Sequence, residues 1–168
     1  DGVLFVPAPE MPSEGCDGME IYNPQAAMSD QAAWAKMADA RKRYPDEAFN
    51  AAQDYRPAIF ARWDKELEKR VFTGIAANDS HKNRAFQGTL FDTYEVSFRS
   101  AVTHILAREL TEAALRRSLR EGRAYVAHDW LADPSGFVFA SSTNLCVYQI
   151  VDSIPLSIDS KFSALLPL

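Results

Sequence analysis

The stretch VFTGIAANDSH, residues 71–81, joins a short apolar segment to a polar loop that contains an acid and an imidazole. The apolar segment 71–76 follows a charged helical pattern, which predicts a buried strand. Asp79 and His81 come directly after it, two residues apart. In an α/β fold, strand ends hold loop side chains on a rigid base, and ligands and metals bind there. Residues 71–81 therefore predict an α/β fold with a site at one strand end.

Asp79 and His81 would offer a carboxylate oxygen and an imidazole nitrogen to a ligand. This combination suits a divalent transition metal, namely Zn, Mn or Fe. The alternative is a polar turn after a strand, in which Asp79 caps the loop and His81 is merely exposed. Taken alone, the short motif favours the turn, so the interpretation depends on the rest of the chain.

Three segments together resemble the PHP family, the metal-dependent phosphoesterases of the polymerase and histidinol phosphatase type. The sequence NDSH at 78–81 is similar to the C-terminal metal motif of that family. Residues 17–23 look like its strand with glycine, acid, aliphatic residue and asparagine, and residues 121–126 look like its late helix-turn-strand. The resemblance spans roughly residues 1–140. It implies a distorted β/α barrel with metals at the strand ends, and hydrolysis of phosphate esters.

The resemblance is incomplete at both ends of the chain. A complete PHP domain opens with a His-x-His strand, and these 168 residues contain no such motif. Ala8 stands where the family has a histidine at a strand end in the middle of the fold. The chain thus resembles the C-terminal half of a PHP domain. We expect an α/β fold with a partial, half-formed barrel over residues 1–135, followed by a β-rich C-terminal segment over residues 136–168.

The predicted site draws on carboxylates and histidines outside the 78–81 motif. Glu10 follows the strand end of Ala8; its alternative is a solvent-facing turn. Glu20 lies in a short apolar strand, where burial raises a carboxyl pKa and suits a general base, unless it faces water or is paired. His128 ends a strand, and its alternative is a pair with Asp129 or a backbone carbonyl. The predicted metal ligands are Asp79, His81 and His128, and the predicted catalytic residues are His81, Glu10 and Glu20.

Two further patterns concern His104 and the cysteines. Apolar residues at helical spacing over 98–106 predict a helix over 98–109, with His104 on its polar side. From residue 124 onward, aromatic and β-branched residues separated by turn sequences predict antiparallel strands. Cys16 and Cys146 are far apart and form no Cys-x-x-Cys motif. We expect two reduced thiols, although a bond between them stays open.

Composition limits the partners. A net charge of −5 leaves no basic surface for nucleic acid, and no stretch approaches the ~18–20 apolar residues of a membrane span. We therefore expect a cytoplasmic protein without nucleic-acid or membrane partners. Half a barrel exposes sheet edges and an apolar face, which a second copy of the chain would cover most simply. The expected assembly is a homodimer.

Three functions remain open at this point. The first is an enzyme, a hydrolase of small phosphate esters of the phosphoesterase or phosphotriesterase type, dependent on a divalent metal held by the Asp79-Ser80-His81 motif. The second is a non-catalytic, oligomerising remnant of a PHP enzyme, which the missing His-x-His motif favours. The third is a metal-free hydrolase with a pocket at a dimer interface. Two ligands alone do not hold a catalytic metal, since three protein ligands and a water are usual.

Overall fold

The computed structural model describes residues 2–7, 10–28, 31–53, 56–86, 88–143, 147–150, 152 and 160–167. The chain forms two compact units, residues 1–131 and 132–168. The fold is mixed α/β with small sheets, as the sequence predicted, whereas the PHP-type barrel stays a prediction.

The first unit contains β1 (Phe5–Val6), β2 (Gly18–Tyr22), α1 (Pro24–Ala27), α2 (Gln31–Ala40), α3 (Ala48–Ala51), α4 (Pro57–Leu67), β3 (Thr73–Ala76), β4 (Ala85–Phe86), β5 (Thr89–Leu90), α5 (Tyr94–Ser100), β6 (Val102–Ile105), α6 (Glu112–Arg120) and β7 (Ala124–Ala127). The second contains β8 (Val138–Ser142), β9 (Val147–Gln149) and β10 (Lys161–Leu165).

A parallel three-stranded sheet in the order β1-β2-β3 supports the first unit. The strand predicted at 71–76 forms as β3 and pairs in parallel with β2. The two backbones approach closely at Gly18, which lies opposite Thr73. A Cβ atom at Gly18 would lie 2.0 Å from the carbonyl oxygen of Thr73 and 2.7 Å from a ring carbon of Phe5. The sheet therefore needs a residue without a side chain at this position.

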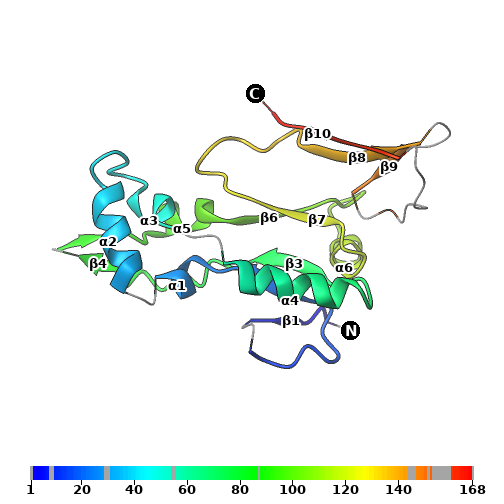
Figure 1. The fold of residues 1–168 in the computed structure, drawn as a ribbon, viewed down its shortest axis with the longest axis horizontal. Helices are drawn as coiled ribbons and strands as arrows, with labels where there is room; N and C mark the ends of the chain where they lie inside the picture. The colour runs from blue at the N-terminus through cyan, green and yellow to red at the C-terminus, as the bar shows by residue number, and fades with distance from the viewer. Residues whose placement is uncertain are drawn as a thin grey trace. The chain divides into compact units, whose positions relative to one another are not determined.

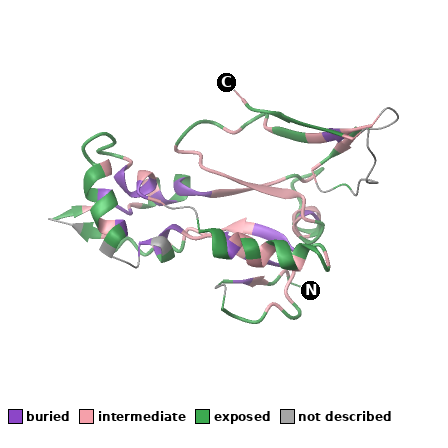
Figure 2. Cartoon of the chain, viewed as in Figure 1, coloured by how far each residue is buried: buried purple, intermediate pink, exposed green. Residues whose placement is uncertain are grey.

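Apolar side chains from the sheet and from α4 form one core. Figure 1 shows α4 running alongside the parallel sheet, and Figure 2 shows buried residues at that contact. The indole of Trp63 on α4 also donates a hydrogen bond to the carbonyl of Phe72, at 2.6 Å. Each fully buried large side chain stabilises the fold by about 1.5–3 kcal/mol. The buried members of this core are Val6, Met19, Ile21, Ile59 and Phe72.

A second core lies among the short helices. Residues of α2 and α3 pack there with Phe91 and with the residue that ends α1. Phe49 on α3 and Met37 on α2 are almost completely buried. Neither short helix would be stable alone in water, so this packing is what holds them. The buried members are Met28, Ala33, Met37, Ala48, Phe49, Ala52 and Phe91.

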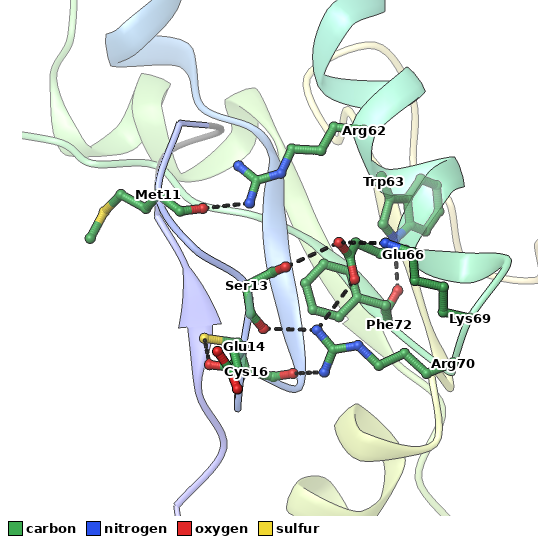
Figure 3. Close-up of polar contacts among 10 residues, drawn as sticks. All are labelled: Met11, Ser13, Glu14, Cys16, Arg62, Trp63, Glu66, Lys69, Arg70 and Phe72. Atoms are coloured by element: carbon green, nitrogen blue, oxygen red, sulfur yellow. Dashed lines mark hydrogen bonds and ion pairs between the residues drawn. The ribbon is translucent and has the colours of Figure 1, made fainter.

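The loop between β1 and β2 is fastened to α4 and to the segment that follows it (Figure 3). Arg70 donates to the carbonyls of Ser13 and Cys16, at 2.8 and 2.7 Å, and its guanidinium lies 4.5 Å from the ring centre of Phe72. Glu66 accepts a hydrogen bond from the Ser13 hydroxyl, at 3.1 Å. Arg70 also lies 3.5 Å from the carboxylate of Glu66. Arg70 and Glu66 thus hold the loop that contains Cys16, although they lie 53 to 57 residues further along the chain than their loop partners.

Residues 98–109 do not form the single helix that their spacing predicted. The helix α5 ends at Ser100, Ala101 is extended, and Val102–Ile105 form β6, which pairs antiparallel with β7. The β-branched residues of 102–105 favour a strand, and the Thr103 hydroxyl meets both the N–H and the carbonyl of Ala76, at 2.9 and 3.2 Å. Pairing with distant segments therefore overrides the local helical pattern.

Two helices begin at residues whose chemistry suits a helix start. Pro57 occupies the first turn of α4, where its missing N–H costs nothing. The Thr111 hydroxyl caps α6 by accepting a hydrogen bond from the N–H of Ala114, at 3.3 Å. The Thr73 hydroxyl also donates to the carbonyl of Leu119, which ties the end of α6 to the parallel sheet.

The second unit is an antiparallel sheet in the order β10-β8-β9. The β-rich C-terminal segment predicted from the turn sequences is present in it. The rings of Phe139 and Phe162 stack with their centres 6.3 Å apart, yet both side chains are largely exposed. Every residue of β10 is exposed. Among the residues described in this unit, the exposed large apolar ones are Val138, Phe139, Val147, Phe162, Leu165 and Leu166.

In the parts of the chain that the structure describes, none of the helices has the length and apolar character needed to cross a membrane. The expected cytoplasmic location stays a prediction.

We expect Gly18→Ala to destabilise the protein by about 1–3 kcal/mol or more, because the added methyl group collides with a backbone oxygen that can move only if β2 and β3 separate. Urea unfolding followed by circular dichroism measures the change. Gly2→Ala is the matched control, since nothing lies within 4 Å of its added Cβ. Equal stability of the two variants would contradict the close approach of the two strands.

Candidate functional site

The carboxyl ends of β2 and β3 lie side by side, because the two strands are parallel neighbours. The N–H of Ala77 donates to the carbonyl of Tyr22, at 3.0 Å, which extends the pairing one residue beyond β3. A register shift between Glu20 and Tyr22 places a bulge in β2 just before this edge. Bulges re-aim side chains and are common beside active sites. The residues that follow both strands thus emerge at one edge of the sheet, as the sequence predicted for Asp79 and His81.

Glu20 is a half-buried carboxylate at this edge, and Asn23 holds it. The amide nitrogen of Asn23 donates to Glu20 Oε2 at 3.1 Å, while its amide oxygen accepts from the N–H of Ala26 at 3.0 Å and caps α1. One asparagine therefore fixes both the carboxylate and the start of a helix. The sequence did not indicate this arrangement of Asn23 and Glu20, because the bulge in β2 arises only when β2 pairs with β3.

Burial raises the pKa of the Glu20 carboxyl above its ordinary value of 4.5. The hydrogen bond from Asn23 lowers that pKa, and the negative charge of Asp79 raises it. Glu20 lies in β2 and Asp79 lies in the loop after the neighbouring parallel strand β3, so both carboxyl groups belong to one part of the sheet. The direction of the pKa shift suits a general acid or base, which works best with a pKa closer to the operating pH.

Asp79 and His81 form a pair in the loop after β3. The distance between His81 Nε2 and Asp79 Oδ1 is 2.9 Å. Both side chains are substantially exposed, 63% for His81 and 48% for Asp79. The backbone of Asp79 is left-handed with φ 47°, and that of Lys82 is left-handed with φ 53°. Two left-handed residues without glycine are uncommon in one short loop, and such strain concentrates at functional sites.

The same loop contains two buried polar atoms without a hydrogen-bond partner among the described residues. They are the side-chain oxygen of Asn78 and the hydroxyl of Ser80. Buried polar groups are normally paired, so each of these atoms is available to a bound water or ligand. The whole NDSH segment therefore offers polar groups at the strand edge, partly exposed and partly covered.

The Asp79–His81 pair can work as an oriented base. A carboxylate that accepts a hydrogen bond from the N–H of one imidazole nitrogen fixes the tautomer, so the other nitrogen has its lone pair free. With Nε2–H directed to Asp79, Nδ1 of His81 becomes the basic atom. This arrangement uses the same logic as the acid–histidine pairs of hydrolases.

The other predicted site residues lie apart from this pair or outside the described residues. Glu10 is exposed in a turn. His128 directs Nδ1 to the carbonyl of Ser100, at 2.6 Å, and its ring meets Tyr22 edge-on with centres 4.7 Å apart. Cys16 is a half-buried free thiol whose sulfur lies 3.9 Å from the carbonyl of Glu14. Ala8 and Cys146 lie outside the described residues.

His104 belongs to a second histidine–acid pair. Its Nε2 lies 3.0 Å from Asp129 Oδ1, and its ring stacks on Tyr125 with centres 4.9 Å apart. The apolar spacing of residues 98–106 predicted a helix with His104 on its polar side. That prediction is wrong, because residues 102–105 form the strand β6. Asp129 was one of two alternative partners expected for His128, the other being a backbone carbonyl. Asp129 pairs with His104, and His128 contacts the backbone carbonyl of Ser100. A strand interpretation of 102–105 would have placed His104 opposite Tyr125.

A metal needs at least three converging ligands. Among the residues that the structure describes, no group of three or more His, Cys, Asp and Glu side chains is placed to hold a metal ion. Asp79 and His81 come together, but His128 and Glu10 do not complete a set with them. The described donor atoms therefore do not fit the divalent metal that the PHP resemblance implies, and metal dependence stays a prediction.

A buried network beside this loop escaped the sequence analysis. Asp92 is completely buried and accepts hydrogen bonds from Gln25 Nε2 and from the N–H groups of Asn83 and Arg84, at 2.7, 3.0 and 2.8 Å. Arg84 Nε donates to Gln25 Oε1, at 2.6 Å. With all its partners supplied by the protein, this carboxylate holds the end of the candidate loop in place. No local pattern signals it, because Gln25 and Asp92 are 67 residues apart.

Comparison of the chain with models of protein families, with curated proteins and with solved structures finds no match. The PHP resemblance therefore stays a prediction from the residues that carry it.

The raised pKa of Glu20 predicts a specific effect of Glu20→Gln on stability. A carboxyl whose folded pKa is raised binds its proton more tightly in the folded state, so its contribution is fully favourable below pH 4.5 and is lost as the pH rises through its folded pKa. Glutamine mimics the protonated form. We expect Glu20→Gln to raise the melting temperature at pH 7 and to leave it unchanged at acid pH.

Glu66 supplies the control of opposite sign. Burial alone would raise its pKa, but the Ser13 hydroxyl, Lys69 and Arg70 hold it below the ordinary value. Glu66→Gln should therefore lower the melting temperature at neutral pH, and the loss should shrink as the pH falls. Scanning calorimetry across pH measures both variants, and the same sign for both would contradict the assignment for Glu20.

Proposed function

We propose that this chain is a hydrolase of phosphate esters that acts at the carboxyl edge of β2 and β3. The observation that carries the proposal is the 2.9 Å contact between His81 and Asp79, beside a carboxyl group, Glu20, whose pKa is raised. An oriented base and a proton-retaining acid at one sheet edge are the two parts that acid–base hydrolysis needs. The phosphate-ester substrate class comes from the PHP resemblance of residues 78–81.

The reaction uses the two groups in opposite roles. Nδ1 of His81 takes a proton from a water molecule while the water oxygen forms a bond to phosphorus. The bond from phosphorus to the leaving oxygen breaks, and the protonated Glu20 gives its proton to that oxygen. Asp79 stabilises the imidazolium that forms. The histidine and the glutamate then return to their starting states by exchanging a proton with solvent, so the products are an alcohol and a phosphate with one ester bond fewer.

Charge at the site selects among phosphate esters. Glu20 and Asp79 lie at the same edge, and the whole chain carries a net charge of −5. A doubly charged phosphate monoester would be repelled by the Asp79 carboxylate and by the net negative charge of the chain, since no metal site among the described residues compensates for them. A neutral phosphate triester escapes this repulsion. The proposed preference is therefore triester over diester over monoester, with good leaving groups favoured.

We expect His81→Ala to lower hydrolysis by about 10²–10⁴-fold, the usual contribution of a positioned acid or base. The assay uses 4-nitrophenyl esters as a neutral triester, a diester and a monoester, each before and after exhaustive chelation and with Zn, Mn or Fe added back. His104→Ala is the matched control, because His104 also pairs with an aspartate at 3.0 Å and no hydrogen bond among the described residues joins its side chain to residues 78–81.

Two outcomes would decide the mechanism. Equal losses in the two histidine variants would contradict catalysis at the strand edge. Activity that disappears on chelation and returns with one metal would contradict the metal-free acid–base route and favour metal dependence through Asp79 and His81. Absence of turnover on all three esters would favour the non-catalytic alternative.

We also propose that the chain forms a homodimer through β10. Among the described strands, β10 pairs on one edge only, with β8, and all five of its residues are exposed. An exposed strand edge with apolar side chains pairs readily with another strand. A two-fold axis through Ser163 would pair β10 antiparallel with its copy. Lys161 would then face Leu165 of the second copy, so the two lysines do not oppose each other.

A charge exchange at Leu165 tests this register. Leu165→Lys would place one lysine opposite Lys161 of the second copy at each of two symmetric positions, whereas Leu165→Glu would place a complementary charge at both. Cross-strand charge pairs contribute about 0.2–1 kcal/mol each, and the symmetry doubles the effect. We therefore expect the Lys variant to dissociate several-fold more readily than the Glu variant in sedimentation equilibrium. Identical dissociation constants, or a monomeric parent protein, would contradict the proposal.

A further inference from the structure

A second concave site lies in the first unit, and neither Asp79 nor His81 is among its lining residues. Its cavity has a volume of about 400 Å³, within the usual range for small-molecule sites. The lining comes from the end of β2, the turn before α3, α3 with the residues after it, and the segment after β7. That last segment is pinned by hydrogen bonds from Trp130 N–H to Arg99 and from Leu131 N–H to His128. The polar and aromatic lining residues of the cavity are Tyr22, Tyr44, Asn50, Gln53, His128 and Trp130.

Aromatic rings form much of the wall. Tyr22 and His128 meet edge to face, with centres 4.7 Å apart and planes at 77°. Tyr44 and Trp130 also meet edge to face, at 6.5 Å and 76°. Each such pair leaves ring faces with negative electrostatic potential beside the cavity. A cation within about 6 Å of a ring centre is attracted by that potential.

Asn50 contributes a buried acceptor at the wall. Its side-chain nitrogen donates to the carbonyl of Val96 at 3.4 Å and to the carboxylate of Glu47. These acceptors fix the orientation of the amide, because a flipped oxygen would face two other oxygens. The amide oxygen then has no donor among the described residues, although Asn50 as a whole is only 2% exposed. An unpaired buried acceptor costs about 1–3 kcal/mol unless a bound molecule donates to it.

Gln53 repeats this arrangement. Its side-chain nitrogen donates to the carbonyl of Phe49 at 2.8 Å, so its amide is oriented as well. The amide oxygen is buried and, within the part of the chain that the structure describes, receives no hydrogen bond. Asn50 and Gln53 both line the cavity, and the amide oxygen of each is closed to solvent and receives no hydrogen bond from the described residues. A ligand with its own N–H or O–H groups would satisfy both oxygens once the two side chains turn toward it.

His128 adds a third acceptor. Its Nδ1 lies 2.6 Å from the carbonyl oxygen of Ser100, which can only accept, so Nδ1 carries the proton. In the neutral ring Nε2 then holds a lone pair. No lysine or arginine is among the described lining residues of this cavity, whereas Lys36 and Arg43 line a neighbouring cavity that shares Tyr44 and Gln53 with it.

We propose that this cavity binds an organic ammonium ion, a protonated primary amine attached to an apolar or aromatic body. The ammonium group supplies the N–H donors for the amide oxygens of Asn50 and Gln53, and its charge is stabilised by the rings of Tyr22, Tyr44 and Trp130. A neutral alcohol lacks the charge, and a quaternary ammonium lacks the donors. The net charge of −5 also favours a cation over an anion. This site is independent of the proposed hydrolysis.

Titration calorimetry with three probes of one shape tests the ligand class. They are phenethylammonium, the neutral 2-phenylethanol and the quaternary phenethyltrimethylammonium, each with the full chain at pH 8. We expect the primary ammonium to bind most tightly, the quaternary ion more weakly and the alcohol weakest, with about tenfold between the first and the last, as expected when both the hydrogen bonds and the ring contacts are lost. Absence of binding by phenethylammonium at millimolar concentration, or equal binding of the alcohol, would overturn the proposal.

Variants locate the site. Tyr44→Leu should weaken phenethylammonium binding about two- to fivefold, the effect of one ring on an exposed cation. Tyr94→Leu is the matched control, because Tyr94 is 48% exposed, similar to the 51% of Tyr44, and does not line the cavity. Gln53→Met should weaken the primary ammonium and leave the quaternary ion unchanged, since only the former donates hydrogen bonds. Equal effects of the two tyrosine variants, or equal effects of Gln53→Met on both ions, would overturn the assignment. A melting curve for each variant confirms that it folds.

Discussion

A side chain at Gly18 would collide with the carbonyl oxygen of Thr73, so the parallel pairing of β2 with β3 depends on a residue without a Cβ at that point. The rest of the first unit follows from this contact. Parallel neighbours bring their carboxyl ends to one edge, where Glu20 and the Asp79–His81 loop meet. The close approach also seats Met19 and Phe72 in the core that α4 covers. A substitution far from the chemistry can therefore disturb the candidate site through the register of two strands.

The degree to which polar groups are satisfied separates structural from functional roles. Asp92 is completely buried and accepts three hydrogen bonds from the protein. It therefore stabilises the loop, and its carboxylate is closed to a substrate. Glu20 receives one hydrogen bond and keeps a raised pKa. The amide oxygens of Asn50 and Gln53 receive none from the described residues. Because an unpaired buried acceptor is costly, these two oxygens are candidates for contact with a ligand, whereas the unpaired buried hydroxyls of Ser97, Ser100 and Ser141 have no such role assigned.

Local pattern and tertiary pairing compete most clearly in residues 98–109. Their apolar spacing fits a helix, yet the helix ends at Ser100 and the chain continues as β6. Four residue pairs with β7 and the hydrogen bonds of Thr103 to β3 outweigh a local preference that is worth only tenths of a kcal/mol per residue. The consequence for function is direct, since His104 changes from a helix-surface residue to a partner of Asp129.

The sequence alone determined those features that depend on near neighbours. The apolar run before Asp79 predicted β3, and the turn-separated C-terminal pattern predicted antiparallel strands. Thr111 and Pro57 likewise act locally, since each is suited to the helix start where it lies. Short spacing also sufficed to bring Asp79 and His81 together, since they are two residues apart. Only the tertiary structure decided which distant groups meet. The bulge at Glu20, the pairing of His104 with Asp129, the network of Asp92, and the cavity that Asn50 shares with Trp130 all join segments tens of residues apart or depend on the exact strand register. Such contacts are set by the packing of whole elements, which no local pattern of residues encodes.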